Sequence, residues 1–175
     1  MRNSKSDYIA FIDSDDLWEK DKLFKQLDFM IKNKYYFTYT NYQPFISDKK
    51  GKNLKEIVPE KSFTFEKFTR NTSIATSTMI INKSSIGTKK FSNTKICEDY
   101  FFKCEILKKN NTAVKLKQNT MFYQISKNSL QSNKLRNLYW VWHINKNTMF
   151  YRISKNSLQS SKIRNLYWVW HINKN

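Results

Sequence analysis

The chain has 175 residues, of which 16% are aromatic and only two each are glycine and proline. This length is enough for a single domain with a buried core, and the scarcity of glycine and proline argues against a low-complexity or disordered chain, although Asn, Lys and Ser are frequent at polar positions. The formal net charge of +18 attracts polyanions, but in a sequence without a helix-turn-helix, zinc-finger or RNA-binding motif it identifies no partner.

The first part of the chain predicts two strands on either side of a helix. Residues Tyr8–Ile12 form a continuous apolar run, which is typical of a strand buried on both faces. Between Glu19 and Lys32, apolar side chains recur at helical spacing and predict a helix. These side chains are Leu23, Leu27, Met30 and Ile31. The aromatic and threonine residues of Tyr35–Tyr42 predict a second strand.

The next part predicts shorter elements and then a longer helix. Residues Ser47–Pro59 have the composition of a loop, and Phe65–Thr69 predict a short helix with Thr64 as its N-cap. Thr78–Ile81 predict another buried strand, and a largely apolar helix is expected from Glu98 to about residue 110. Strands that alternate with helices predict an α/β domain with a mostly parallel sheet flanked by helices.

The two cysteines and the lack of long apolar runs indicate in which cellular compartment the protein is expected. Cys97 and Cys104 are seven residues apart, a spacing that puts both on one face of a helix and suits neither a tight disulfide nor a zinc knuckle. We therefore expect reduced thiols packed in a core. No signal peptide is recognisable, and no apolar run approaches the ~20 residues of a membrane span. The predicted location is cytoplasmic.

The tail is a direct repeat, because residues 119–146 recur almost unchanged at 147–174. The copies differ only at Gln124/Arg152, Asn133/Ser161 and Leu135/Ile163. Two copies are too few for a solenoid, and near-identity indicates a tandem duplication in which one copy docks and the other is surplus.

Three carboxylates, those of Asp13, Asp15 and Asp16, directly follow the first strand. In open α/β sheets, ligands bind outside the carboxyl ends of the strands. Asp13 and Asp15 are one residue apart, so both can face one point and bind a hard divalent cation such as Mg²⁺, whose remaining ligands are waters and substrate phosphates. The alternative is a capped turn in which Asp16 is the N-cap of the following helix.

Glu98 and Asp99 form a second acidic site at the start of the predicted apolar helix. Acidic residues in a first helical turn are favoured by the helix dipole, so capping is one interpretation. The other is a general base that deprotonates an acceptor hydroxyl, as in inverting glycosidases. Together the two sites describe a mechanism, in which a cation stabilises a leaving phosphate and a base activates the attacking oxygen.

The segment YIAFIDSDDLWEKDKLFKQLDFM closely resembles the signature of family-2 glycosyltransferases, in which a strand ends in Asp-Ser-Asp-Asp and is followed by Trp, Lys-Leu and a Gln-bearing helix. Three further stretches, NTSIATSTMIINKSSIG, ICEDYFFKCEILKKN and YRISKNSLQSSKIRNLYW, follow in the family's order. The resemblance covers nearly the whole chain from Tyr8 onward. It is strongest to small bacterial enzymes that build lipopolysaccharide or capsule glycans.

This resemblance implies a GT-A (Rossmann-like) fold, a nucleotide-sugar donor, a glycan or lipid-linked acceptor, a divalent cation (Mn²⁺ or Mg²⁺) and inversion at the anomeric carbon. By resemblance, Asp15 and Asp13 would bind the metal, and Asp99 would be the catalytic base with Glu98 as the neighbouring candidate. The implied donor-binding residues are Asp13, Asp16, Trp18 and Arg152. The implied organisation is a partial GT-A catalytic domain in residues 1–118, a strand/helix copy in 119–146 and a second copy in 147–175, which form a helical C-terminal repeat.

The chain also departs from the family's pattern. Only seven residues precede the first strand, where the family has a strand ending in Pro-x-Tyr-Asn, an acidic nucleotide-binding stretch and an Arg-Asn segment. Lys103 replaces a Trp after Glu-Asp-Tyr, and the first repeat copy has Gln124 where the second restores the family's Arg as Arg152. We therefore expect an N-terminally truncated transferase that binds its donor weakly or not at all.

Other partners are predicted from exposed sheet edges and from the basic, aromatic repeat. Exposed sheet edges would promote self-association. The basic, aromatic stripe of each repeat copy either packs on the core or lies peripherally at the inner face of the cytoplasmic membrane. The alternative function is a non-catalytic basic module that binds single-stranded nucleic acid or an anionic membrane surface. Nucleic acid is the less favoured partner, because the acidic motif would repel phosphates unless a metal lies between them.

Overall fold

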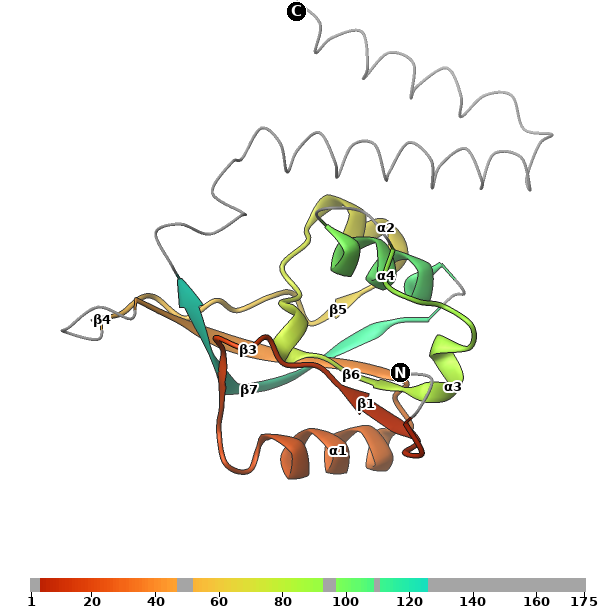
Figure 1. The fold of residues 1–175 in the computed structure, drawn as a ribbon, viewed down its shortest axis with the longest axis horizontal. Helices are drawn as coiled ribbons and strands as arrows, with labels where there is room; N and C mark the ends of the chain where they lie inside the picture. The colour runs from red at the N-terminus through yellow and green to blue at the C-terminus, as the bar shows by residue number, and fades with distance from the viewer. Residues whose placement is uncertain (1–3, 47–51, 93–96, 109–110, 126–175) are drawn as a thin grey trace, which may run out of the picture. The chain divides into compact units, whose positions relative to one another are not determined.

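The computed structural model describes residues 4–46, 52–92, 97–108 and 111–125, which all belong to one unit of the chain, Met1–Asn137 (Figure 1). The predictions for the tail beyond residue 125 lie outside the described residues; they include the helical repeat, its second copy and Arg152. None of the described helices is both long and apolar enough to cross a membrane.

The described strands form one sheet in the order β1-β6-β3-β7-β2, with β4 paired to β3 and β5 paired to β7. Their bounds are β1 Tyr8–Ala10, β2 Leu17–Trp18, β3 Phe37–Ile46, β4 Lys52–Asn53, β5 Ser62–Phe63, β6 Ile80–Asn82 and β7 Ala113–Ile125. The long strands β3 and β7 lie side by side at its centre, and the short strands pair along them (Figure 1).

The sheet is mixed, which corrects the prediction of a mostly parallel sheet. Among the described pairs only β3 and β7 are parallel, whereas β1–β6, β3–β6, β2–β7, β3–β4 and β5–β7 are antiparallel. The alternation of strands and helices predicted the α/β class, which the structure confirms. Alternation does not fix the direction in which the chain re-enters the sheet, and here short strands and turns return it antiparallel.

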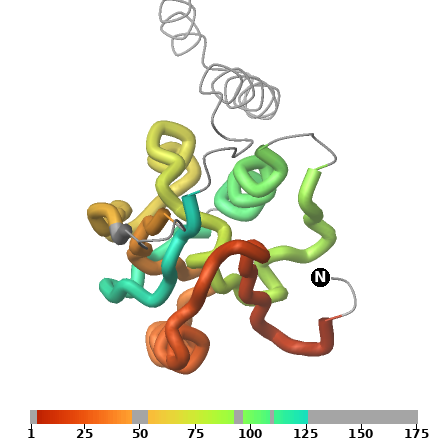
Figure 2. The backbone as a smooth tube through the Cα atoms, turned by 60° about the vertical axis from the view of Figure 1, so that its left-hand side comes forward, coloured from red at the N-terminus to blue at the C-terminus, as the bar shows by residue number. Residues whose placement is uncertain are grey.

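Helices cover both faces of the sheet. The helix α1, Lys22–Asn33, lies on one face, and α2, Phe65–Arg70, and α4, Glu98–Leu107, lie on the other (Figures 1 and 2). A single 3-10 turn, η1 (Thr76–Thr78), leads into β6, and the short helix α3 (Lys83–Ile86) follows that strand. This arrangement brings η1 between the two acidic segments of the sequence.

The later helices agree with their predictions. Helix α2 begins after Thr64, whose hydroxyl accepts a hydrogen bond from the Lys67 N–H at 3.4 Å, as expected of an N-cap. Helix α4 begins at Glu98 and is buried on almost all sides. Cys104 is buried within it, but Cys97 precedes the helix at a φ of 60° and is partly exposed. The predicted sharing of one helix face by the two thiols is therefore wrong.

The face of the sheet under α2 and α4 holds an aromatic core. Phe63 contacts both Tyr39 and Phe68, with ring centroids 5.5 and 5.9 Å apart, and Phe68 stacks on Tyr100 at 5.4 Å. Phe102 is also fully buried. Rings packed in this way bury large apolar areas, so this layer fixes where α4 and its acidic first turn lie against the sheet.

Helix α1 is buried through a polar face, although its apolar stripe predicted the helix. Lys22, Gln26 and Met30 are buried, whereas Leu23 is 42% exposed and Ile31 is 59% exposed. The helix itself was correctly predicted; of its apolar stripe Met30 is buried, whereas Leu23 and Ile31 are exposed.

Hydrogen bonds explain the orientation of α1. Gln26 Nε2 donates to Thr38 Oγ1 and to the Thr78 carbonyl oxygen, both at 3.0 Å. Lys22 Nζ donates to Gln26 Oε1 at 2.6 Å and to the same Thr78 carbonyl at 3.3 Å. The Thr78 carbonyl lies more than fifty positions along the chain from either donor, so helical periodicity could not have revealed it.

The extent of the first strand also changes, whereas the predicted division of the chain between residues 118 and 119 stays a prediction. Strand β1 is limited to Tyr8–Ala10, its residues are only half-buried, and Ile12 beyond it is exposed, so it is not a strand buried on both faces. The predicted boundary between residues 118 and 119 falls inside β7, whose pairing with β3 continues from Ala113 to Ile125. The beginning of the first repeat copy is therefore part of the sheet.

Candidate functional site

The acidic segment after β1 is a tight turn. The Asp16 N–H donates to the Asp13 carbonyl oxygen at 3.1 Å, which closes the turn over Ser14 and Asp15. Asp13, Ser14 and Asp15 are exposed, whereas Asp16 is only 5% exposed. The four residues therefore divide into an exposed acidic tip and a buried anchor.

Asp16 anchors the turn through both carboxylate oxygens. The Ser77 hydroxyl donates to Asp16 Oδ2 at 2.5 Å, and the Gln124 backbone N–H donates to Asp16 Oδ1 at 3.1 Å. The Asp13 N–H donates to Ser77 Oγ at 2.9 Å, so the same serine also holds the other end of the turn. Burial raises the pKa of Asp16, and the hydrogen bonds from Ser77 and Gln124 oppose that rise. The sequence predicted a donor-binding role for Asp16, which stays a prediction; its contacts make it a positioning residue.

Trp18 also supports this turn. Its indole N–H donates to the Ser77 carbonyl oxygen at 2.8 Å, and the Lys22 ammonium lies 4.9 Å from the centre of its ring. The predicted contact between Trp18 and the donor remains a prediction. Arg152, the remaining predicted donor-binding residue, lies outside the described residues.

The second acidic site lies in the first turn of α4. Thr76 Oγ1 donates to Asp99 Oδ2 at 2.9 Å, and Lys103 Nζ donates to the same oxygen at 2.8 Å. Glu98 is exposed, whereas Asp99 is partly buried. Burial alone would raise the pKa of Asp99, but the charge and hydrogen bond of Lys103, helped by Thr76, lower it to about 2.

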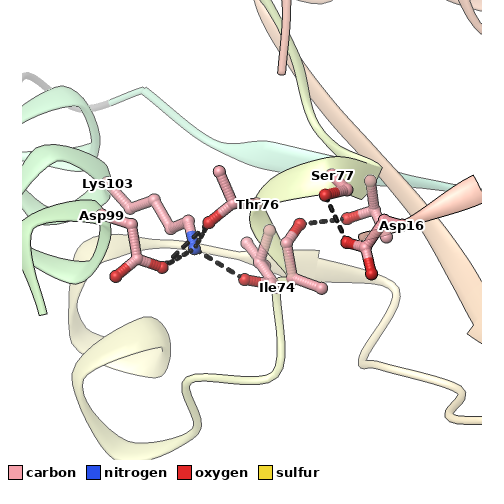
Figure 3. A network of polar contacts seen from close by, with 8 residues as sticks. Asp16, Ile74, Thr76, Ser77, Asp99 and Lys103 are labelled. Carbon is pink, nitrogen blue, oxygen red and sulfur yellow. Dashed lines mark hydrogen bonds and ion pairs between the residues drawn. The ribbon is translucent and has the colours of Figure 1, made fainter. Parts of the chain in front are cut away.

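Two adjacent residues of η1 join the acidic turn to the second acidic site. Thr76 binds Asp99, and Ser77 binds Asp16 (Figure 3). The segment ATSTM that contains them was part of the family resemblance, but sequence reasoning assigned it no site residue. The available signal was its run of three hydroxyl side chains directly before an apolar strand, which is unusual in a buried segment.

The two acidic sites are also coupled electrostatically. Burial raises the pKa of Asp13, and the negative charges of Asp99 and Asp15 raise it further. Charges of both acidic sites therefore act on Asp13, and the functional pairing of the two sites stays a prediction. Carboxyl groups whose pKa is shifted by burial and by nearby charges, as those of Asp13 and Asp99 are, occur often at functional sites.

The acidic tip suits a divalent cation with an open coordination shell. Asp13 and Asp15 offer two exposed carboxylates, which is the number of protein ligands that Mg²⁺ commonly takes beside waters and phosphates. Within the part of the chain that the structure describes, no group of three or more His, Cys, Asp or Glu side chains is arranged to hold a metal. The residues thus fit a cation shared with a substrate better than a closed structural metal site.

Comparison with known proteins identifies the family. Residues 1–101, more than half of the chain, match the sequence profile of Glycosyl transferase family 2. The chain belongs to this family. The matched range includes the acidic turn, Thr76, Ser77 and Asp99, whereas Lys103 and Gln124 lie beyond it.

Several relatives of this chain are named as glycosyltransferases. TuaG of Bacillus subtilis strain 168, named as a teichuronic acid biosynthesis glycosyltransferase, is 32% identical over 146 residues, which cover 82% of this chain and 57% of that protein. WfgD of Escherichia coli, a UDP-Glc:alpha-D-GlcNAc-diphosphoundecaprenol beta-1,3-glucosyltransferase, is 31% identical over 145 residues, which cover 82% of this chain and 56% of WfgD. The chain thus spans little more than half the length of these relatives.

The fold is also similar to that of a solved structure. The crystal structure of S. aureus TarS 1-349 has a TM-score of 0.52 with 15% sequence identity, and the match covers 70% of this chain and 37% of TarS. This likeness supports the fold alone. It agrees with the expected incomplete GT-A architecture of a family-2 domain.

Proposed function

We propose that this family-2 chain transfers a sugar from a nucleotide-sugar donor to a glycan or lipid-linked acceptor during the synthesis of a bacterial surface glycan, with inversion and with a divalent cation. The observation that carries the proposal is the pair of acidic sites held side by side by Thr76 and Ser77. The names of the relatives support the substrate classes, since WfgD is named for a UDP-sugar donor and a diphosphoundecaprenol-linked acceptor.

The acidic tip would receive the donor. Asp13 and Asp15 would hold Mn²⁺ or Mg²⁺ between them and the donor diphosphate, as their exposure and mutual charge favour. The bound cation would stabilise the negative charge that develops on the leaving diphosphate. This tip would be kept in a fixed position by Asp16, which is bound by Ser77 and the Gln124 N–H. Trp18 would hold Ser77 through the hydrogen bond from its indole N–H to the Ser77 carbonyl oxygen.

The start of α4 would receive the acceptor. Asp99 would accept the proton of the attacking hydroxyl, because its carboxylate is ionised and is oriented by Thr76. Glu98 remains the neighbouring candidate for this base, since it is exposed at the same helix start. The two roles are separable by mutation, as described below.

We further propose that the chain works in the cytoplasm and associates with itself or with the inner face of the membrane. Several large apolar side chains support an association surface: Phe24 is 77% exposed, and Leu23, Ile31 and Leu17 are also exposed. Sedimentation of a clean monomer would contradict the self-association. Vesicle co-sedimentation that is unchanged by deletion of residues 147–175 would remove the membrane role of the second copy.

Isothermal titration of nucleoside diphosphates and nucleotide-sugars, with and without Mn²⁺, tests the proposed function. In contrast to the weak or absent donor binding expected from the sequence, this proposal requires metal-dependent binding that disappears in Asp15→Asn and persists in the matched variant Asp28→Asn, whose carboxylate forms an exposed ion pair with Lys32 on α1. A folded protein that binds no donor would contradict the proposal. Metal-independent binding of single-stranded nucleic acid that weakens steeply with salt would instead support a basic binding module.

A further inference from the structure

Lys103 is a buried cation beside the candidate base. It lies on α4 one helical turn after Asp99 and is only 2% exposed. Lysine is almost never buried to this extent unless its charge is paired.

The three N–H donors of the Lys103 ammonium are all used within the fold. They reach Asp99 Oδ2 at 2.8 Å, the Ile74 carbonyl oxygen at 2.8 Å and Thr76 Oγ1 at 3.1 Å (Figure 3). An ammonium has three donors and no acceptor, so none remains for a ligand. Direct contact between Lys103 and a substrate is therefore not its role.

We propose that Lys103 is a positioning residue for the candidate base: its ammonium fixes the Asp99 carboxylate against the Ile74–Thr76 segment and weakens it as a proton acceptor. This inference rests on the proposed function for its consequence, because the base role of Asp99 belongs to that proposal. The contact itself stands independently of it. Lys103 and Asp99 are four residues apart with the acid on the N-terminal side, which is the favourable order for an ion pair on a helix.

The groups that face Asp99 come from three elements. Lys103 and Glu98 are on its own helix, with Cys97 just before it; Thr76 is on η1, and Asp13 is on the acidic turn. Burial favours the protonated form of Asp99, whereas Lys103, Thr76 and the Tyr100 backbone N–H favour the carboxylate. Lys103 is the only positive charge among these described groups. Without it, the effect of burial, which favours the protonated form of Asp99, should predominate.

The consequence concerns the strength of the base. A carboxyl whose pKa is about 2 stays ionised at neutral pH but accepts a proton reluctantly, whereas catalytic bases are tuned toward the working pH. The ion pair therefore lowers the basicity of the Asp99 carboxylate and fixes its orientation. Replacing Lys103 by a neutral side chain would raise the pKa of Asp99 and make it a stronger proton acceptor.

The test measures the pKa of Asp99 by ¹³C NMR of side-chain carboxyls in the full chain, with the signal assigned through Asp99→Asn. We expect the pKa to rise from about 2 in the wild type to above the ordinary 3.8 in Lys103→Met. Lys103→Arg keeps the charge and should keep the pKa low. Lys108→Met removes another lysine of the same region, which pairs with Glu105, and should leave Asp99 unchanged.

Two results would overturn the inference. One is an Asp99 pKa that is unchanged in Lys103→Met, or in the neutral variant Lys103→Gln if Lys103→Met does not fold by circular dichroism. The other is a wild-type Asp99 that already titrates above pH 3.8, which would show that Lys103 does not hold the carboxylate ionised. This second measurement needs no variant other than the one used for assignment.

A transfer assay then separates this inference from the proposed function. If the wild type transfers sugar, the acid limb of its kcat/KM profile should move to higher pH in Lys103→Met, which a merely structural lysine would not cause. If the wild type shows no transfer and binds no donor, the proposed function fails. The NMR titration uses neither donor nor acceptor, so it still decides whether Lys103 controls Asp99.

Discussion

The acidic turn and the start of α4 each lie beside a buried lysine, but the two lysines differ in what balances their charge. Lys22, under Trp18, donates to neutral oxygens only, and burial lowers its pKa to about 7. Lys103 donates to Asp99 and holds the pKa of that carboxyl at about 2 against the effect of burial. A buried cation thus either gives up its proton readily or keeps a carboxylate ionised.

The difference extends to the carboxylates. Asp13 and Asp15 lie at the tip of the turn, where partial burial and then the negative charges of Asp99 and Asp15 raise the pKa of Asp13. Asp99 is held by a cation and a hydroxyl in one orientation. The first site is thus suited to capture a cation from solution, and the second to present a fixed oxygen to a substrate.

The largest expected effect concerns Lys22 and the pH dependence of stability. Its pKa is about 7 in the folded chain and near 10.5 in the unfolded chain, so the unfolded chain binds more protons between these values. The free energy of unfolding therefore rises with pH across this window, by up to about 5 kcal/mol at about 1.36 kcal/mol per pKa unit. Urea denaturation across the window measures the rise.

The variant Lys22→Met should lose this rise, whereas the exposed control Lys20→Met should keep it. Wild-type and Lys22→Met curves that stay parallel through the window would show that Lys22 keeps its proton when folded. The contrast drawn above between Lys22 and Lys103 would then be wrong.

The next largest effect separates the two candidate bases of α4. Asp99→Asn should reduce the transfer rate by about 10²–10⁴-fold, which is what a general base contributes. Glu98→Gln should change it by no more than a few-fold, because Glu98 lacks the fixed contacts of Asp99. Steady-state rates with saturating donor measure this, and the reverse ranking would make Glu98 the base.

A smaller effect distinguishes anchor from tip within the acidic turn. Asp16→Ala leaves the Ser77 hydroxyl and the Gln124 N–H without their acceptor and should lower the free energy of unfolding by about 3 kcal/mol. Asp15→Ala changes an exposed side chain and should cost less than about 0.5 kcal/mol. If denaturant titrations showed equal losses of unfolding free energy in the two variants, Asp15 would also stabilise the turn.

The smallest effect sharpens the role of Lys103. Thr76→Val removes the hydroxyl that donates to Asp99 and should cost about 1 kcal/mol of stability, because Lys103 still holds the carboxylate. The exposed control Thr69→Val, whose hydroxyl bonds the Glu66 carbonyl, should be nearly neutral. Thermal denaturation compares the two, and a loss of several kcal/mol in Thr76→Val would make Thr76 the principal support of Asp99.

The sequence predicted those features that depend on neighbours along the chain. The N-cap of Thr64 and the start of α4 at Glu98 are local signals, and the structure has both. The α/β class also follows from local alternation. The acidic residues were identified for the same reason, since carboxylates that directly follow an apolar run are visible without a structure.

The features that escaped prediction depend on partners far away in sequence. The buried polar face of α1 needs the Thr78 carbonyl, and the anchoring of Asp16 needs Ser77 and Gln124. Strand direction has the same origin, because it is set by which strands pair and not by their composition. The duplicated tail beyond residue 125 lies outside the described residues, so its predicted docking stays a prediction.

The hydrogen bond between Asp16 and Gln124 spans 108 positions of the chain. At ordinary rates of protein synthesis, Gln124 follows Asp16 out of the ribosome by roughly 5–20 s. The residues of the acidic turn are therefore synthesised early, but their hydrogen bond to Gln124 forms late. It requires the central strands β3 and β7 to pair, and these strands are also far apart in the sequence. A nascent chain therefore carries its candidate cation ligands unanchored until Gln124 has been made.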